Sequence, residues 1–134
     1  MIFLRSLAFN VLFYLTLVIW LLVATPTFLM PRAAILGVAK AWGRWNVWLM
    51  RVVCGTRVQF LGVDRIPPGP LIIASKHQSM WETFALLRFI DQPIFILKRE
   101  LNWIPFFGWY LTKAGMIGID RKAGVRSLKM MARM

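Results

Sequence analysis

The chain has 134 residues, enough for one domain at most, 59% of them are hydrophobic, and 17 Lys and Arg against five Asp and Glu give a net charge of +12. This composition excludes a disordered tail, and one cysteine with one histidine excludes a disulfide scaffold and a structural zinc site. Hydrophobicity combined with positive charge is typical of a protein at a membrane surface, because anionic headgroups attract Lys and Arg while apolar side chains enter the acyl region.

An uncharged apolar stretch covers residues 6–29 and is long enough to span a bilayer, which needs about 20 residues. Pro26 and Pro31 predict the end of this helix. A signal peptide is the alternative, but the stretch exceeds the usual h-region of ~7–15 residues and no small-residue cleavage site follows. Arg5 alone precedes the stretch, whereas four basic residues follow within residues 32–51. The positive-inside rule therefore places the rest of the chain in the cytoplasm.

A second helix is predicted over residues 33–53, with Lys40, Arg44 and Arg51 within about 40° of one another on the helical wheel. The opposite side is apolar and rich in tryptophan: Ile35, Val38, Trp42, Trp45, Leu49 and Val52. This pattern is what a helix lying in the membrane interface needs. A helix packed on a protein core, with its cations in water, fits the same pattern. A third possibility is a hairpin of both helices that enters a single leaflet, with the prolines at its bend.

From residue 57 onward, strand and helix patterns alternate, which predicts an α/β domain. Strands are expected at residues 57–63, 71–74, 93–97 and 116–119, a helix at 79–89, and a turn at the Pro-Pro-Gly-Pro sequence of 67–70. Residues 125–134 predict a helix without a stop signal, so we expect the chain to be the N-terminal portion of a longer protein.

The predicted organisation is therefore a hydrophobic helical membrane anchor over residues 1–30, of one or two helices, and an amphipathic basic, Trp-rich interfacial helix over 31–56. Residues 57–134 form the N-terminal part of a mixed-sheet α/β domain. The basic residues are scattered and no nucleic-acid motif is present, so a membrane-tethered nucleic-acid binder is the weaker explanation of the charge. No nucleic-acid partner is expected.

Candidate chemistry lies at His77, the one histidine of the chain, and at Glu82, five residues later. Imidazole is the commonest general base near neutral pH. On one continuous helix the two side chains would be about 140° apart, but they can meet if His77 lies in a loop and Glu82 in the first helical turn. Ser79 as N-cap with Glu82 at N3 predicts a capping box, which is also the purely structural alternative for Glu82.

Three segments in order resemble the glycerolipid acyltransferases. Residues 73–82, Ile-Ala-Ser-Lys-His-Gln-Ser-Met-Trp-Glu, resemble the family's first motif, His-x-x-x-x-Asp. Residues 98–109, Lys-Arg-Glu-Leu-Asn-Trp-Ile-Pro-Phe-Phe-Gly-Trp, look like the segment that follows it, and residues 115–121, Gly-Met-Ile-Gly-Ile-Asp-Arg, resemble the second motif, which ends Phe-Ile-Asp-Arg. Within the family the chain is most similar to the bacterial 1-acylglycerol-3-phosphate acyltransferases.

The chain departs from the family pattern at three positions. Glu82 replaces the usual Asp, Lys76 stands where Asn usually precedes the histidine, and Gly118 replaces the Phe of the second motif. The third motif, Phe-Pro-Glu-Gly-Thr-Arg, and the fourth are not in the 134 residues. Because the third motif helps to bind the phosphorylated acceptor in the family, the activity of this chain by itself is an open question.

The resemblance implies transfer of a fatty acyl group from acyl-CoA or acyl carrier protein to lysophosphatidic acid, giving phosphatidic acid in phospholipid biosynthesis. It implies that His77 is the catalytic base and Glu82 its partner. The acceptor phosphate would be bound by Arg121, with Asp120 orienting the guanidinium and Lys98 as a weaker candidate. A surface ion pair is the alternative for Asp120 and Arg121.

No metal and no cofactor other than the acyl-donor substrate are expected. The partners are membrane lipids, lysophosphatidic acid and the donor, at the cytoplasmic side of the inner (cytoplasmic) membrane. The alternatives are a non-catalytic membrane-binding fragment and an acyltransferase acting on another lysolipid or on glycerol 3-phosphate. The apolar run at residues 103–109 is expected either to line the acyl site or to dip into the bilayer, with ordinary core as the alternative.

Overall fold

The structure is a computed structural model that describes residues 2–76 and 78–120. It divides into two compact units, one built from Met1–Trp20 and Gly37–Asp91 and the other from Leu21–Leu36 and Gln92–Met134. The predicted helix at residues 125–134 lies outside the described residues.

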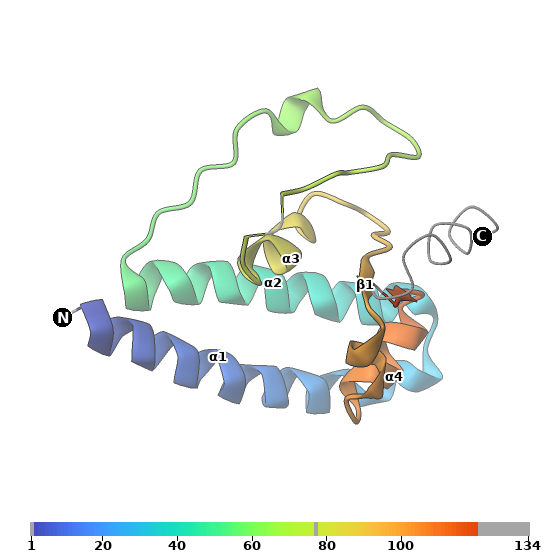
Figure 1. The fold of residues 1–134 in the computed structure, drawn as a ribbon, viewed down its shortest axis with the longest axis horizontal. Helices are drawn as coiled ribbons and strands as arrows, with labels where there is room; N and C mark the ends of the chain where they lie inside the picture. The colour runs from blue at the N-terminus through green and yellow to red at the C-terminus, as the bar shows by residue number, and fades with distance from the viewer. Residues whose placement is uncertain (1, 77, 121–134) are drawn as a thin grey trace. The chain divides into compact units, whose positions relative to one another are not determined.

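Two long helices form the N-terminal part of the chain: α1 (Ile2–Ala24) and α2 (Arg32–Cys54), joined by a 3-10 helix, η1 (Thr25–Leu29) (Figure 1). Pro26 stands in the first turn of η1 and has no N–H to donate, so the α-helix ends just before it. One helical stretch among the described residues, Ile2–Leu29, is long and apolar enough to cross a membrane, and its most apolar window of 18 residues has a mean hydropathy of 2.4. The predicted pair of helices is confirmed.

The first unit has an aromatic core at Phe13 of α1. Its buried ring lies 5.6 Å from that of Trp42 on α2 and 6.2 Å from that of Phe84 on α3 (Trp81–Leu86). Gly43 lets α3 approach α2, because a Cβ atom there would lie 2.7 Å from the main-chain oxygen of Phe84. The core therefore ties α3, which carries Glu82, to both long helices.

The apolar face predicted for α2 is divided between two environments. Trp42 packs against Phe13 and Leu49 is buried, as expected for a helix on a protein core. Trp45 and Trp48 are exposed with their ring centroids 4.9 Å apart, as expected for an interfacial helix. The interfacial placement of residues 31–56 stays a prediction.

Two predicted strands are absent from the described residues. Residues 57–61 are irregular, and a short 3-10 helix, η2 (Val63–Arg65), follows them. Residues 71–76 are irregular and exposed, and Ile72 is 96% exposed. The prediction of a buried strand at residues 71–74 is therefore wrong. A strand needs a neighbour for its main-chain hydrogen bonds, and no described strand pairs with this segment.

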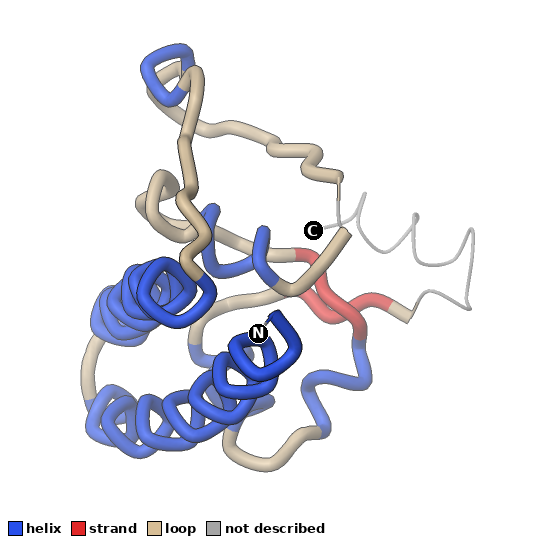
Figure 2. The backbone as a smooth tube through the Cα atoms, turned by 90° about the vertical axis from the view of Figure 1, so that its left-hand side faces the viewer, coloured by secondary structure: helices blue, strands red, loops and turns tan. Residues whose placement is uncertain are grey.

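The second unit contains a two-stranded parallel sheet, β1 (Ile96–Lys98) and β2 (Ile117–Ile119), shown in red in Figure 2. A 3-10 helix, η3 (Arg99–Trp103), and α4 (Phe107–Lys113) connect the strands. Parallel strands joined through a helix confirm the α/β class and the strands predicted near residues 93–97 and 116–119, although β1 begins three residues late.

Candidate active site

The turn before α3 is organised by the Glu82 carboxylate. It accepts hydrogen bonds from the main-chain N–H groups of Gln78 and Ser79, at 3.0–3.1 Å, and from the Ser79 hydroxyl at 3.1 Å. The Ser79 hydroxyl in turn accepts a hydrogen bond from the N–H of Trp81 at 3.2 Å. The Glu82 half of the predicted capping box is therefore present, whereas the Ser79 hydroxyl bonds the N–H of Trp81 instead of that of Glu82. The helix α3 runs from Trp81 to Leu86 after Met80 as N-cap, shorter than the predicted helix of residues 79–89.

These hydrogen bonds also keep Glu82 ionised. The main-chain N–H of Glu82 itself lowers the pKa of the carboxyl most, and desolvation opposes it. Hydrogen bonds from the N–H groups of Gln78 and Ser79 and from the Ser79 hydroxyl lower it further, so the pKa lies below its usual value. The carboxylate is therefore negatively charged at neutral pH. A carboxylate close to an imidazole stabilises the imidazolium that forms when the imidazole takes up a proton.

His77 lies outside the described residues, so its pairing with Glu82 stays a prediction. The structure places its neighbours Lys76 and Gln78 in an exposed loop that leads into α3. Glu82 lies in the first turn of α3, as the sequence predicts for the acidic member of the pair.

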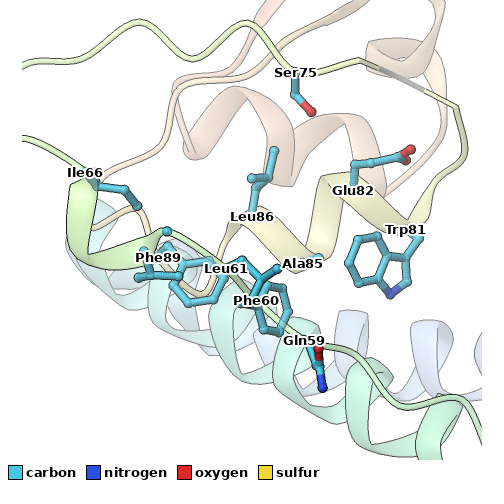
Figure 3. A pocket seen from close by; sticks show the side chains of 12 residues that line it. Gln59, Phe60, Leu61, Ile66, Ser75, Trp81, Glu82, Ala85, Leu86 and Phe89 are labelled. Atoms are coloured by element: carbon cyan, nitrogen blue, oxygen red, sulfur yellow. The ribbon is translucent and has the colours of Figure 1, made fainter.

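An apolar groove of about 400 Å³ borders Glu82 (Figure 3). Its walls come from the loop at residues 59–66 and from α3 with the residues after it; the lining includes Phe60, Ser75, Trp81, Leu86 and Phe89. The rings of Phe60 and Phe89 meet edge to face at 4.6 Å. Mostly apolar walls with a few polar groups are typical of small-molecule sites of this size.

Sequence reasoning missed this groove. The alternation in residues 57–63 predicts a strand. In the structure this segment is irregular, and the Phe60 ring stacks on that of Trp81 in α3, with the centroids 6.2 Å apart. The contact between Phe60 and Phe89 joins residues 29 positions apart. The available signal is the pair of aromatic residues near the two ends of the predicted helix, Trp81 and Phe89.

The second group of candidate residues lies at the carboxyl end of the parallel strands. Lys98 is the last residue of β1 and pairs in register with Ile119, the last residue of β2, so Asp120 follows at the same edge. Ligands of parallel α/β sheets bind at this edge. Lys98 is exposed, and its Nζ lies 3.7 Å from the Glu100 carboxylate. Arg121 lies outside the described residues, so its role as phosphate ligand stays a prediction.

The structure explains why glycine stands at the second-motif position where the family has phenylalanine. A Cβ atom on Gly118 would lie 2.6 Å from the Asn102 side-chain nitrogen and 3.3 Å from the Arg99 Cα. Asn102 of η3 therefore occupies the space that a larger residue in β2 would need. The Asn102 side chain thus fills the space beside Gly118.

Among the described residues, no three of His, Cys, Asp and Glu are grouped as metal ligands. The expected reaction without a metal or cofactor stays an expectation. Glu82 belongs to the first structural unit, whereas Lys98 and Asp120 belong to the second.

Comparison with known proteins gives the class of protein. A family model described as Acyltransferase matches residues 57–134, which is more than half of the chain. The chain therefore belongs to the acyltransferase family, and the resemblance of its motifs is confirmed.

Named relatives narrow the comparison further. The chain is 45% identical over 102 residues to a 1-acyl-sn-glycerol-3-phosphate acyltransferase of Pseudomonas aeruginosa, which covers 76% of this chain and 40% of that protein. Proteins of the same name in Helicobacter pylori and Saccharomyces cerevisiae are 38% and 28% identical, each over 54% of this chain, and the match covers 32% and 24% of their own lengths. The chain thus spans less than half of the length of each of these relatives. No solved structure gives a significant match.

Proposed function

We propose that the complete protein transfers a fatty acyl group from an acyl thioester to the free hydroxyl of lysophosphatidic acid, which gives phosphatidic acid. The observation that carries the proposal is the Glu82 carboxylate, held ionised at the start of α3 beside an apolar groove, five residues after the one histidine. The names of the relatives support lysophosphatidic acid as the acceptor.

The proposed reaction proceeds by direct attack. His77 takes the proton of the acceptor hydroxyl while that oxygen forms a bond to the thioester carbonyl carbon. The carbon–sulfur bond then breaks, and the imidazolium returns the proton to the leaving thiolate, so the products are an ester and a thiol. Glu82 holds the imidazole tautomer and stabilises the imidazolium, as the acid does in a Ser-His-Asp triad.

The acceptor phosphate is proposed to bind at the carboxyl end of β1 and β2. Arg121 follows β2 directly after Asp120, and a guanidinium recognises phosphate through paired, charge-assisted hydrogen bonds. Lys98 at the end of β1 adds a point charge at the same edge. The acyl donor is acyl-CoA or acyl carrier protein, and the reaction uses no other cofactor.

We also propose that α1 anchors the protein in the inner membrane, with the catalytic part on the cytoplasmic side. The most apolar window of α1 and η1 is only 11% buried within the protein, whereas the core helix of a soluble domain is covered by its own fold. Washing membranes with high salt and with alkaline carbonate tests this proposal. The protein should stay in the pellet after both washes, and release by either one contradicts anchoring by apolar burial.

The function itself is tested with the complete gene product purified in detergent. It is incubated with lysophosphatidic acid and, in separate reactions, with acyl-CoA or with acyl carrier protein that carries the same fatty acid. The lipid products are identified by mass spectrometry. We expect phosphatidic acid from one donor at least, and none from His77→Ala. Preferred acylation of glycerol 3-phosphate or of another lysolipid reassigns the acceptor, and failure to acylate any acceptor leaves the membrane-binding alternative.

A further inference from the structure

Four large apolar side chains are exposed on the connection between β1 and β2. Trp103 is 73% exposed, Phe106 and Trp109 are each 57% exposed, and Ile104 is 46% exposed. We call these four residues the aromatic ledge. Exposed apolar patches of this kind mark interaction surfaces, and they contradict the expectation that residues 103–109 are ordinary core.

The backbone of the ledge is strained at Phe106. Phe106 has φ of 62° and ψ of −56°, and the N–H of Phe107 donates a 2.7 Å hydrogen bond to the Pro105 carbonyl, which makes a γ-turn with positive φ. A bulky side chain rarely adopts this conformation, because it costs free energy. Since Phe106 is more than half exposed, burial within the chain gives little in return. The ring instead meets Trp109, with the two centroids 5.1 Å apart.

Hydrogen bonds attach the helix that carries the ledge to the end of the apolar N-terminal segment. The Tyr110 hydroxyl donates to the carbonyl of Leu21 in the last turn of α1, at 2.7 Å, and the Lys113 ammonium donates to the carbonyl of Phe28 in η1, at 3.0 Å. The Tyr110 and Phe28 rings stack at 4.6 Å. Lys113 follows Trp109 by four residues and therefore lies on the same face of α4.

Two further apolar side chains are exposed in the same structural unit. Leu22 in the last turn of α1 and Leu29 in η1 are both exposed, the latter to 96%. Tryptophan and tyrosine beside a lysine at the end of an apolar helix are typical of the membrane–water interface. The net charge of +12 also favours a surface of anionic lipids.

We propose that the aromatic ledge inserts into the interfacial layer of the membrane that α1 enters, as a second point of lipid contact. This inference rests on the membrane attachment proposed above. β2 begins four residues after α4, so insertion of the ledge holds β2, and with it Asp120, at the bilayer surface where an amphiphilic acceptor arrives. The ledge thus orients the proposed phosphate site toward the lipid headgroups.

Site-specific labelling in the complete protein tests the proposal. In a background from which the native cysteines, Cys54 among them, have been replaced by alanine, an environment-sensitive fluorophore is attached in turn to Trp109→Cys, Phe106→Cys, Leu22→Cys and Asp64→Cys. Each protein is reconstituted into phosphatidylethanolamine–phosphatidylglycerol vesicles with a quencher attached near the top of the acyl chains. Leu22→Cys reports the anchor, and Asp64→Cys in the charged η2 gives the aqueous signal.

We expect strong quenching at positions 22, 106 and 109 and little at position 64. Quenching at 22 with aqueous signals at 106 and 109 overturns the ledge while the anchor stands. A blue-shifted but unquenched fluorophore at 106 and 109 shows that protein covers the ledge, which also overturns the proposal. Aqueous signals at all positions overturn membrane attachment itself. Two ledge positions keep the test valid if one substitution prevents folding, which a melting curve of each labelled protein shows.

Discussion

The guanidinium of Arg32 donates a 2.8 Å hydrogen bond from Nε to the main-chain oxygen of Ala114, 82 residues further along the chain. Its two remaining nitrogens each lie 3.4 Å from an oxygen acceptor, the Gln92 side chain and the Pro93 carbonyl. One side chain at the start of α2 therefore holds the residue that ends α4 and the segment that leads into β1. The fork of the guanidinium suits this role because it donates in several fixed directions.

Arg32→Lys should destabilise the second unit although it keeps the charge. A lysine can replace one of the three donors, so we expect a loss of about 1.5–3 kcal/mol of unfolding free energy, the range for a hydrogen bond to a charged group. The measurement is the thermal unfolding of the complete protein in detergent. Arg44→Lys, an exposed residue of α2, is the matched control, and an equal effect of the two substitutions contradicts the role of Arg32.

Glu82→Gln separates catalysis from helix capping. Glutamine also serves at N3 of a capping box, so the fold should survive, while loss of the negative charge should lower kcat strongly if Glu82 stabilises the His77 imidazolium. Glu82→Asp restores the residue usual in the family and should keep part of the activity. His77→Ala gives the kcat without the base for comparison, since a positioned base contributes ~10²–10⁴-fold to the rate. A folded Gln variant with near-normal turnover would leave capping as the whole role of Glu82.

Arg121→Ala should weaken use of the acceptor far more than use of the donor. If the guanidinium binds the acceptor phosphate, the KM for lysophosphatidic acid rises and the KM for the acyl donor changes little. Arg121→Lys should recover only part of the loss, because an ammonium lacks the paired donor geometry. Steady-state kinetics with each substrate varied in turn make the comparison. An unchanged KM for lysophosphatidic acid in the Ala variant counts decisively against this role.

Gly118 and Asn102 should be coupled. Gly118→Ala places a Cβ against the Asn102 amide and should cost about 1–3 kcal/mol of unfolding free energy, as overpacking does. Asn102→Ala alone should cost less, since the Asn102 side-chain oxygen is buried without a hydrogen-bond partner among the described residues. The double variant should be more stable than the sum of the single effects predicts, in a double-mutant cycle measured by thermal unfolding. Additive effects contradict the close approach.

Acid should loosen the start of α3 through Glu82. Its pKa is lower in the folded protein than in the unfolded chain, where glutamate titrates near about 4.3, so its contribution is complete above that value and is lost as pH falls through the folded pKa. Hydrogen exchange of the Ser79 amide, which donates to the carboxylate, should therefore lose protection in acid. Glu82→Gln is the control and should show no such pH dependence, and the same pH dependence in both proteins rules out Glu82 as the cause.

The long helices, the strands β1 and β2 and the cap of α3 could be predicted from the sequence, because each shows a pattern among residues that are close together in the sequence. The uncharged stretch of residues 6–29 identifies α1, and the spacing of Ser79 and Glu82 identifies the cap. Residues 71–74 could not be assigned in this way. An apolar run shows which side chains avoid water, whereas a strand exists only if another strand supplies its hydrogen bonds. The groove was missed for a similar reason, because Phe60 meets Phe89 only through the fold.

The bonds from Tyr110 and Lys113 to the end of α1 and to η1 have a consequence for the order of folding. The donors to the Leu21 and Phe28 carbonyls, Tyr110 and Lys113, are synthesised 89 and 85 residues after them. At ~5–20 residues per second that delay is on the order of ten seconds. If α1 is the anchor proposed above, it therefore reaches the membrane well before α4 has been synthesised. Docking of α4 is then a late step against a helix already in lipid, and a defect in α4 should leave an inserted but unfinished protein.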